Sequence, residues 1–117
     1  MTPFGAKLRS LRNKHRITLK AFAAALNVSA AYISALEHGR RGRPASGLVL
    51  EICGHLNLNW DEAEELKRLA MLSQPKVTLD TAGLSPRATE MANRLKSSLA
   101  GLSEEKISDI LKIISAD

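Results

Sequence analysis

The chain has 117 residues, of which 44% are apolar and only 3% aromatic, and its formal net charge is +5. This length accommodates one domain, or one small domain with an appendage. The single cysteine, Cys53, excludes an intramolecular disulfide and favours a reducing compartment. The first five residues lack the apolar segment of a signal peptide, and no apolar run approaches the ~18 residues of a membrane span. The sequence therefore predicts a soluble, cytoplasmic protein without a membrane partner.

Positive charge is concentrated in the first half of the chain. Residues 1–60 contain nine Lys and Arg against two Glu, a net charge of +7. Residues 61–117 contain eight Lys and Arg against ten Asp and Glu, a net charge of −2. A basic region of this kind attracts polyanions such as nucleic acids. The alternative is a basic soluble domain with no such partner.

Three helices are predicted in the first forty residues. Each begins at a residue that can cap a helix N-terminus: Thr2 before Pro3, Thr18, and Ser29. The first helix is expected to end near His15. The second is expected to stop at Asn27, because asparagine tolerates the left-handed conformation that often ends a helix. Apolar residues at helical spacing predict the buried faces, namely Phe4, Leu8, Leu11, Phe22, Ala23, Leu26, Val28, Ile33 and Leu36.

Residues 38–45 contain three arginines, two glycines and a proline, which exclude a helix. Ser46 is expected to cap a fourth helix that buries Leu48, Ile52 and Leu56. Asn59 and Glu62 have the spacing of a capping box, which predicts the start of a fifth helix. The inward positions of that helix are Ala63, Leu66, Leu69, Ala70 and Leu72. Cys53, within the fourth helix, is expected to be a small buried apolar side chain.

The composition changes at Ser73, and the next residues have no helical period. We therefore predict a first domain over residues 1–73, a linker over 74–85 and a C-terminal helical extension over 86–117. Ser85 and Pro86 begin the first helix of this extension, Gly101 interrupts it, and Ser103 begins the last helix. Their apolar stripes are Ala88, Met91, Ala92, Leu95 and Leu99, and Ile107, Ile110, Leu111 and Ile114.

The joint pattern of residues 4–58 resembles the lambda-repressor-like (Cro/C1, XRE-type) helix-turn-helix family. The matching segments are Leu8-Arg9-Ser10-Leu11-Arg12, Phe22-Ala23, Val28-Ser29, Tyr32-Ile33-Ser34 and Leu36-Glu37-His38-Gly39, followed by a basic loop that ends at Pro44. Such a unit places its second helix in the major groove of double-stranded DNA. The resemblance implies a five-helix DNA-binding domain and transcriptional control in a bacterium or phage. With the C-terminal two-helix extension, the predicted fold class is all-α.

The resemblance also implies which residues face DNA. Arg12 and Glu37 match an ion pair that holds the third helix to the first; the alternative for Arg12 is a contact to a phosphate. At the base-reading positions the chain has alanine, which cannot make the bidentate hydrogen bonds that distinguish bases. Direct readout is therefore expected to be weak, with specificity drawn from phosphate spacing, DNA shape and dimer geometry. The predicted DNA-binding residues are Thr18, Leu19, Lys20, Ser29, Ala30, Ala31, Tyr32, Ser34, Ala35, Arg40, Arg41 and Arg43.

Two of these assignments have alternatives. Tyr32 either contacts DNA or packs beside the second helix. Arg40, Arg41 and Arg43 directly follow the third helix and are placed to reach phosphates; the other reading of this run is a solvated loop.

Catalysis, metals, cofactors and small-molecule effectors are not predicted. His15, His38 and His55 lie far apart and share no metal-ligand spacing with Cys53. The chain has neither a phosphate-binding glycine-rich loop nor the context of a nucleophile elbow. The C-terminal extension is expected to be too small for an obvious ligand pocket.

The two C-terminal helices can pack onto the first domain, pair with a second copy, or bind another protein. Pairing is favoured, because family members bind two half-sites about one helical turn apart. The residues expected to form the dimer are Met91, Leu95, Leu99, Ile107, Ile110, Leu111 and Ile114. The leading function is a repressor that binds an operator as a homodimer. The alternatives are an antitoxin-type autoregulator whose C-terminal helices bind a partner protein, and a module that has lost DNA specificity and serves protein contacts.

Overall fold

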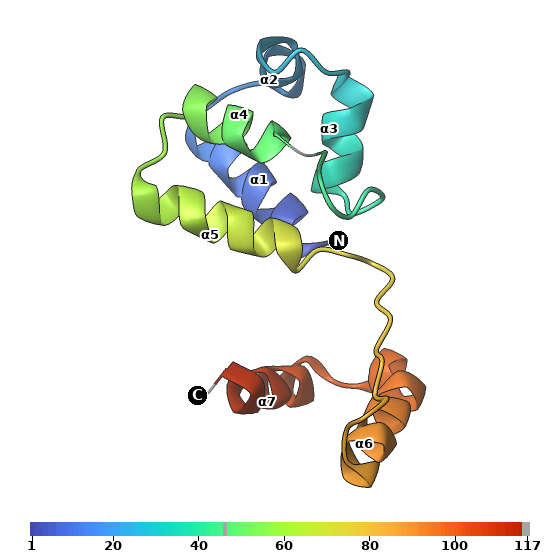
Figure 1. Ribbon diagram of the computed structural model, residues 1–117. Helices are drawn as coiled ribbons and strands as arrows, with labels where there is room; N and C mark the ends of the chain where they lie inside the picture. Colours follow the sequence, from blue (N-terminus) through green and yellow to red (C-terminus); the bar gives the residue numbers. More distant parts are fainter. Residues whose placement is uncertain (46, 116–117) are drawn as a thin grey trace. The chain divides into compact units, whose positions relative to one another are not determined.

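The computed structural model describes residues 1–45 and 47–115 and divides the chain into two compact units, Met1–Val77 and Thr78–Asp117. All the regular elements in these residues are helices (Figure 1). The first unit contains α1 (Pro3–Lys14), α2 (Leu19–Ala25), α3 (Ala30–Glu37), α4 (Leu48–His55) and α5 (Trp60–Met71). The second contains α6 (Pro86–Ser98), the short 3-10 helix η1 (Leu99–Gly101) and α7 (Glu104–Ser115). The predicted all-α fold, with five helices followed by a helical extension, is confirmed.

Side-chain caps begin most of the helices in the first unit. The hydroxyls of Thr2, Thr18 and Ser29 each accept a hydrogen bond from the backbone N–H three residues further on, at 3.0 to 3.1 Å. These bonds satisfy donors that the first turn of a helix leaves free. Asn59 and Glu62 form a complete capping box at the start of α5. All four caps are confirmed as predicted.

The fourth helix begins differently. Ser46 lies outside the described residues, and the N-cap position of α4 is held by Gly47, with φ 87° and no side-chain cap. A left-handed backbone at the cap suits glycine, which has no Cβ to clash with the adjoining carbonyl.

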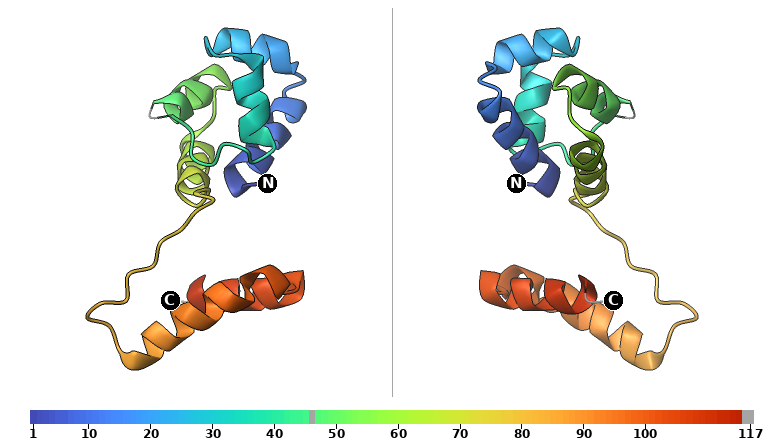
Figure 2. Two further views of the ribbon diagram at one scale, coloured as in Figure 1. Left: turned by 90° about the vertical axis from the view of Figure 1, so that its right-hand side faces the viewer. Right: turned by 90° about the vertical axis from the view of Figure 1, so that its left-hand side faces the viewer.

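The core of the first unit lies where the helices cross. The packed pairs are α1 with α3, α1 with α5, α2 with α3, and α4 with α5 (Figure 2). The buried apolar residues are Phe4, Leu8, Leu11, Phe22, Ala23, Leu26, Ile33, Leu36, Leu48, Ile52, Leu56, Leu66 and Ala70. Val28 and Cys53 are half-buried beside this core, and burial raises the pKa of the Cys53 thiol. Leu72 is exposed just beyond the end of α5, so its predicted inward position is wrong.

The second and third helices form a helix-turn-helix. The chain bends by 112° between α2 and α3, within the range of about 90–120° usual for this motif. Asn27 has φ 57° and ends α2 as predicted. Ala23 is buried, and its carbonyl oxygen accepts a hydrogen bond from the backbone N–H of Val28 at 3.0 Å. This bond closes the turn. No single helix in the described part of the chain is long and apolar enough to cross a membrane; only this bent pair, taken together, passes a test of length and composition.

The segment that follows α5 is still packed against the first unit. Ser73 is 2% exposed. Its hydroxyl accepts the backbone N–H of Phe4 at 2.9 Å and donates to the Leu69 carbonyl oxygen at 2.6 Å. The change in composition at Ser73 therefore does not mark the end of packed structure, and the compact unit extends to Val77.

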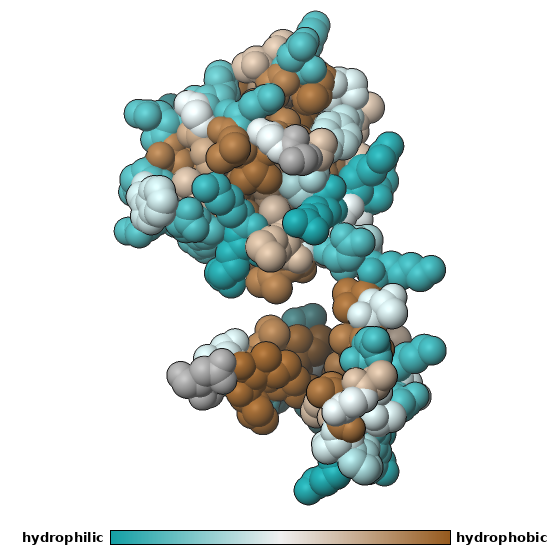
Figure 3. Space-filling model, viewed as in Figure 1, coloured by the Kyte–Doolittle hydropathy of each residue, from teal (hydrophilic) through white to brown (hydrophobic). Residues whose placement is uncertain are grey.

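The described residues of the second unit, unlike those of the first, form no core of buried side chains. Within its described residues, α6, η1 and α7 contain no buried side chain. Ile113 and Ile114 are 76% and 65% exposed, and Met91 is 67% exposed. The space-filling view shows apolar surface gathered over α7 (Figure 3).

The packing of Gly5 on α1 against the backbone of α3 gives a stability prediction. A Cβ at Gly5 would lie against the Leu36 carbonyl oxygen and 3.1 Å from the Glu37 carbonyl oxygen. We expect Gly5→Ala to lower the free energy of unfolding by about 1–3 kcal/mol, because backbone must move apart. The matched control is Gly54→Ala in α4, where nothing lies within 4 Å; it should raise that free energy by about 0.5–1 kcal/mol. Urea denaturation measures both, and a neutral Gly5→Ala would contradict the packing described here.

Candidate nucleic-acid interface

The N-terminal ends of α2 and α3 carry exposed polar groups. Thr18 and Ser29 are exposed, and each hydroxyl accepts one backbone N–H in its cap. A hydroxyl used in this way can still donate its own proton, for example to a phosphate oxygen. Lys20 is exposed beside them, whereas Leu19 is half-buried against the core. Of the predicted contacts at the start of α2, Thr18 and Lys20 are therefore freely accessible and Leu19 is not.

The outer face of α3 offers few hydrogen-bonding groups. Ala30 and Ala31 are exposed and Ala35 is half-buried. Ser34 is half-buried next to the ring of His38. The Nδ1 atom of His38 donates to the Ser34 carbonyl oxygen at 2.8 Å and lies 3.4 Å from the Ser34 hydroxyl. A methyl group can touch the methyl of thymine but cannot hydrogen-bond a base edge. This face can therefore lie against a groove while making few direct base contacts.

Tyr32 connects α3 to the loop that precedes α4. Its side chain is half-buried against the core. Its hydroxyl accepts the backbone N–H of Ala45 at 3.1 Å. Tyr32 thus supports this loop, a role that its sequence context does not indicate.

Three exposed arginines lie on residues 40–45, which we call the arginine loop. The backbone N–H groups of Arg40 and Arg41 donate to the Ala35 carbonyl oxygen at 2.9 and 3.2 Å. The bond between Tyr32 and Ala45 holds the other end of the loop. Within the residues that the structure describes, the ion pairs do not include Arg40, Arg41 or Arg43. Their guanidinium groups are therefore available to an external anion.

The middle of the arginine loop rests on the segment that follows α5. Gly42 is buried, and a Cβ at this position would lie against the ring of Pro75 and 2.6 Å from the Ser73 carbonyl oxygen. Only glycine permits this close approach without displacing backbone. Pro44 is also buried. This support could not be predicted from the sequence, where the one signal for it is a glycine between two arginines.

An ion pair fixes the other side of the site. Arg12 on α1 donates from Nε to Glu37 Oε2 at 2.7 Å and from Nη2 to Oε1 at 3.1 Å. Its Nη1 also donates to the Ile17 carbonyl oxygen at 2.9 Å. Glu37 is 2% exposed, and its hydrogen bond raises the pKa of Arg12. Because Glu37 is the last residue of α3, the pair fixes the end of this helix, next to the start of the arginine loop.

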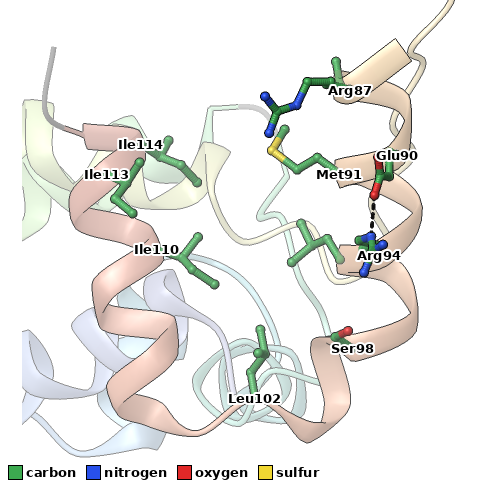
Figure 4. Close-up of a pocket in the computed structure, with 11 residues that line it drawn as sticks. Arg87, Glu90, Met91, Arg94, Ser98, Leu102, Ile110, Ile113 and Ile114 are labelled. Atoms are coloured by element: carbon green, nitrogen blue, oxygen red, sulfur yellow. Dashed lines mark hydrogen bonds and ion pairs between the residues drawn. The ribbon is translucent and has the colours of Figure 1, made fainter. Parts of the chain in front are cut away.

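The second unit contains an apolar groove between α6 and α7 (Figure 4). Its volume is about 740 Å³. The walls come from both helices and include Met91, Leu95, Ile110, Ile113 and Ile114, with Leu102 at the closed end. The expectation that this region is too small for a pocket is therefore wrong. No group of three or more His, Cys, Asp or Glu in the described ranges is placed to hold a metal ion.

The fold and this site define a helix-turn-helix protein. The sequence model of the family described as "Helix-turn-helix domain" matches residues 3–66. The match covers more than half of the chain, and the chain belongs to this family. The matched residues all lie in the first unit.

Two relatives from Bacillus subtilis (strain 168) are similar to the chain. One carries the name uncharacterized HTH-type transcriptional regulator RghRB and is 33% identical over 61 residues, which are 52% of this chain and 44% of the relative. The other is named HTH-type transcriptional repressor RghR and is 34% identical over 61 residues, 52% of this chain and 45% of the relative. The chain thus matches less than half the length of each relative. No solved structure matches it significantly.

Proposed function

We propose that this chain is a DNA-binding transcriptional regulator, specifically a repressor that binds an operator as a homodimer. The observation that carries the proposal is the placement of three exposed arginines on a loop whose backbone is held at the end of a helix-turn-helix. Arg12 and Glu37 hold α3 to α1, and Tyr32 and Gly42 hold the arginine loop. The names of the two similar proteins, a transcriptional regulator and a transcriptional repressor, agree with this function.

In this proposal α3 enters the major groove and the arginine loop binds the phosphates beside it. Phosphate contacts position a protein on the duplex, whereas base contacts specify the sequence. Because the outer face of α3 is formed by alanines, we expect much of the specificity to come from DNA shape and half-site spacing. The proposed DNA contacts are Thr18, Leu19, Lys20, Ser29, Ala30, Ala31, Tyr32, Ser34, Ala35, Arg40, Arg41 and Arg43.

The homodimer in this proposal forms through the second unit. A single helix-turn-helix reads few base pairs, and a dimer doubles the site by presenting two such motifs. The exposed apolar surface of α6 and α7 is the surface that such a dimer would cover. The proposed residues are Met91, Leu95, Leu99, Ile107, Ile110, Leu111 and Ile114. The predicted linker over residues 74–85 precedes them, and its first residues, up to Val77, belong to the first unit.

Selection of bound DNA from a random library, followed by mobility-shift titration across salt, tests the proposal. We expect a site with two related halves about one helical turn apart. The logarithm of affinity should fall linearly with the logarithm of salt concentration, by about 0.9 for each phosphate contacted. Absent binding, or binding that does not depend on salt, would overturn the function proposed here.

Ala30→Gln tests the placement of α3. Glutamine can make two hydrogen bonds to an adenine edge, which discriminate against other bases by about 1–3 kcal/mol. We therefore expect the substitution to change the preferred base at one position of each half-site. Ala6→Gln, on the exposed side of α1, is the matched control and should leave the preference unaltered. If both variants selected the original site, α3 would not lie in the groove.

The groove of the second unit also favours a second candidate, an antitoxin-type autoregulator. In that case the apolar surface of α6 and α7 would bind a different protein instead of a second copy. Co-purification of the product of a neighbouring gene with the chain, in a fixed ratio, would support this candidate over the homodimer.

A further inference from the structure

We propose that Arg16, in the turn between α1 and α2, is a further phosphate-binding residue of the DNA interface. The inference rests on the proposed function and adds one contact to those named there. The backbone of this residue has a conformation unfavourable to arginine, yet the residue carries an exposed, charged side chain.

Four helices of the first unit end with the same turn. At the ends of α1, α2, α3 and α4, the second residue past the helix has a left-handed backbone. Its N–H and the next N–H donate to carbonyl oxygens of the last helical turn, which is the Schellman motif. The residues at this position are Arg16 with φ 55°, Asn27 with φ 57°, Gly39 with φ 77° and Asn57 with φ 52°. Glycine and asparagine are usual here, so Arg16 is the exception among the four.

The turn itself does not need an arginine. Its hydrogen bonds use only backbone atoms: the N–H of Arg16 donates to the Asn13 carbonyl oxygen at 3.0 Å, and the N–H of Ile17 donates to the Arg12 carbonyl oxygen at 3.1 Å. The side chain of Arg16 is exposed, and the ion pairs among the described residues do not include it. Strained residues of this kind cluster at functional sites. The guanidinium group of Arg16 therefore points to a contact outside the chain.

The turn lies where a helix-turn-helix approaches phosphate. Arg16 is two residues before Thr18, the exposed N-cap of α2. When the second helix of such a motif occupies the major groove, the first crosses the DNA backbone. Here the first helix is α2, so the turn that leads into it comes close to that backbone. A guanidinium group can bind phosphate through two parallel hydrogen bonds, which suits Arg16 to this position.

Arg12 fixes this turn relative to α3. Its Nη1 donates to the Ile17 carbonyl oxygen at 2.9 Å, while Nε and Nη2 donate to Glu37 at the end of α3. One guanidinium group thus connects the turn that carries Arg16 with the helix that enters the groove. The backbone of Arg16 is therefore already ordered, and binding costs this residue only the rotamer freedom of its side chain.

Arg16→Asn tests the proposal, because it should change stability and DNA affinity in opposite directions. Asparagine tolerates the left-handed backbone, so we expect the equilibrium constant for folding, measured by urea denaturation, to rise about fivefold. Loss of one charged hydrogen bond to phosphate should lower the affinity for a mixed-sequence DNA duplex about tenfold near 0.1 M salt. The slope of log affinity against log salt should become shallower by about 0.9. Mobility-shift titrations at several salt concentrations measure affinity and slope.

Two variants provide matched controls. Arg16→Lys keeps both the positive charge and the unfavourable backbone, so we expect the stability and the salt slope of the unaltered chain. Arg68→Ala removes one positive charge from an exposed position on α5. It should leave affinity and slope as they are, because α5 lies outside the proposed interface.

The outcomes separate this contact from the function as a whole. If Arg16→Asn keeps the affinity and slope of the unaltered chain, or if Arg68→Ala lowers both equally, the phosphate contact is overturned while the DNA-binding function stands. If the unaltered chain binds no duplex DNA at any salt concentration, the proposed function and this contact are overturned together.

Discussion

Arg12→Met is expected to lower the free energy of unfolding by about 3–5 kcal/mol, among the largest effects of any single change in the chain. The reason is that Glu37 is 2% exposed and both of its carboxylate oxygens accept hydrogen bonds from Arg12. Removing the guanidinium leaves a buried carboxylate without its counter-ion. It also leaves the Ile17 carbonyl oxygen without the hydrogen bond from Arg12. Urea denaturation followed by circular dichroism measures the change.

Two variants separate the ion pair from simple loss of charge. Arg9→Met, at an exposed position on the same helix, should change stability by no more than about 0.5 kcal/mol. Arg12→Met combined with Glu37→Leu should recover most of the loss, because no charge is then left buried. Removing one partner of a buried ion pair usually lowers the free energy of unfolding by several kcal/mol. If Arg12→Met alone lowered it by less than about 1 kcal/mol, Glu37 would have found another partner.

The double variant also has a functional consequence. Even if its stability recovers, α3 has lost the bond that fixes its last residue to α1. The orientation of α3 relative to α1 then depends more on apolar packing, which is less directional than a bidentate ion pair. We infer that the pair serves to hold the DNA-binding surface as much as to stabilise the fold.

The features that sequence could predict are those governed by neighbouring residues. Thr18, Ser29 and the Asn59 capping box act within one turn of their own helix, and Asn27 ends α2 through its own backbone conformation. Buried faces follow from helical spacing and were predicted for the same reason. The predicted inward position of Leu72 is wrong because the apolar spacing continues one residue past Met71, where α5 ends.

Features that join distant segments could not be predicted in this way. Tyr32 reaches across to Ala45, and Gly42 packs on the segment containing Ser73 and Pro75. Neither contact leaves a periodic signal, because each depends on how the helices are arranged in space. The alanine face of α3 was visible in the sequence, but the support of the arginine loop was not. The part of the site that gives the loop its shape is therefore the part that required a structure.

Replacing all three loop arginines, in Arg40→Ala/Arg41→Ala/Arg43→Ala, is expected to lower DNA affinity about 100-fold or more near 0.1 M salt, since each charged hydrogen bond to phosphate contributes about 1.5–3 kcal/mol. The salt dependence should also become shallower by about 2.7, or about 0.9 for each lost phosphate contact. The loss should be similar for all DNA sequences, because phosphates carry no sequence information. Mobility-shift titrations at several salt concentrations measure both quantities.

Gly42→Ala separates the charge of the loop from its shape. This variant keeps all three arginines but cannot keep the loop against Ser73 and Pro75. We expect a smaller loss of affinity, a salt slope close to that of the unaltered chain, and a reduced preference for the selected site. Arg68→Ala, exposed on α5, removes one positive charge outside the loop; it is the control for the triple variant and should alter neither slope nor preference. If the triple variant kept the original slope, the arginines would not touch phosphate. If Gly42→Ala kept the full sequence preference, the packed shape of the loop would have no part in specificity.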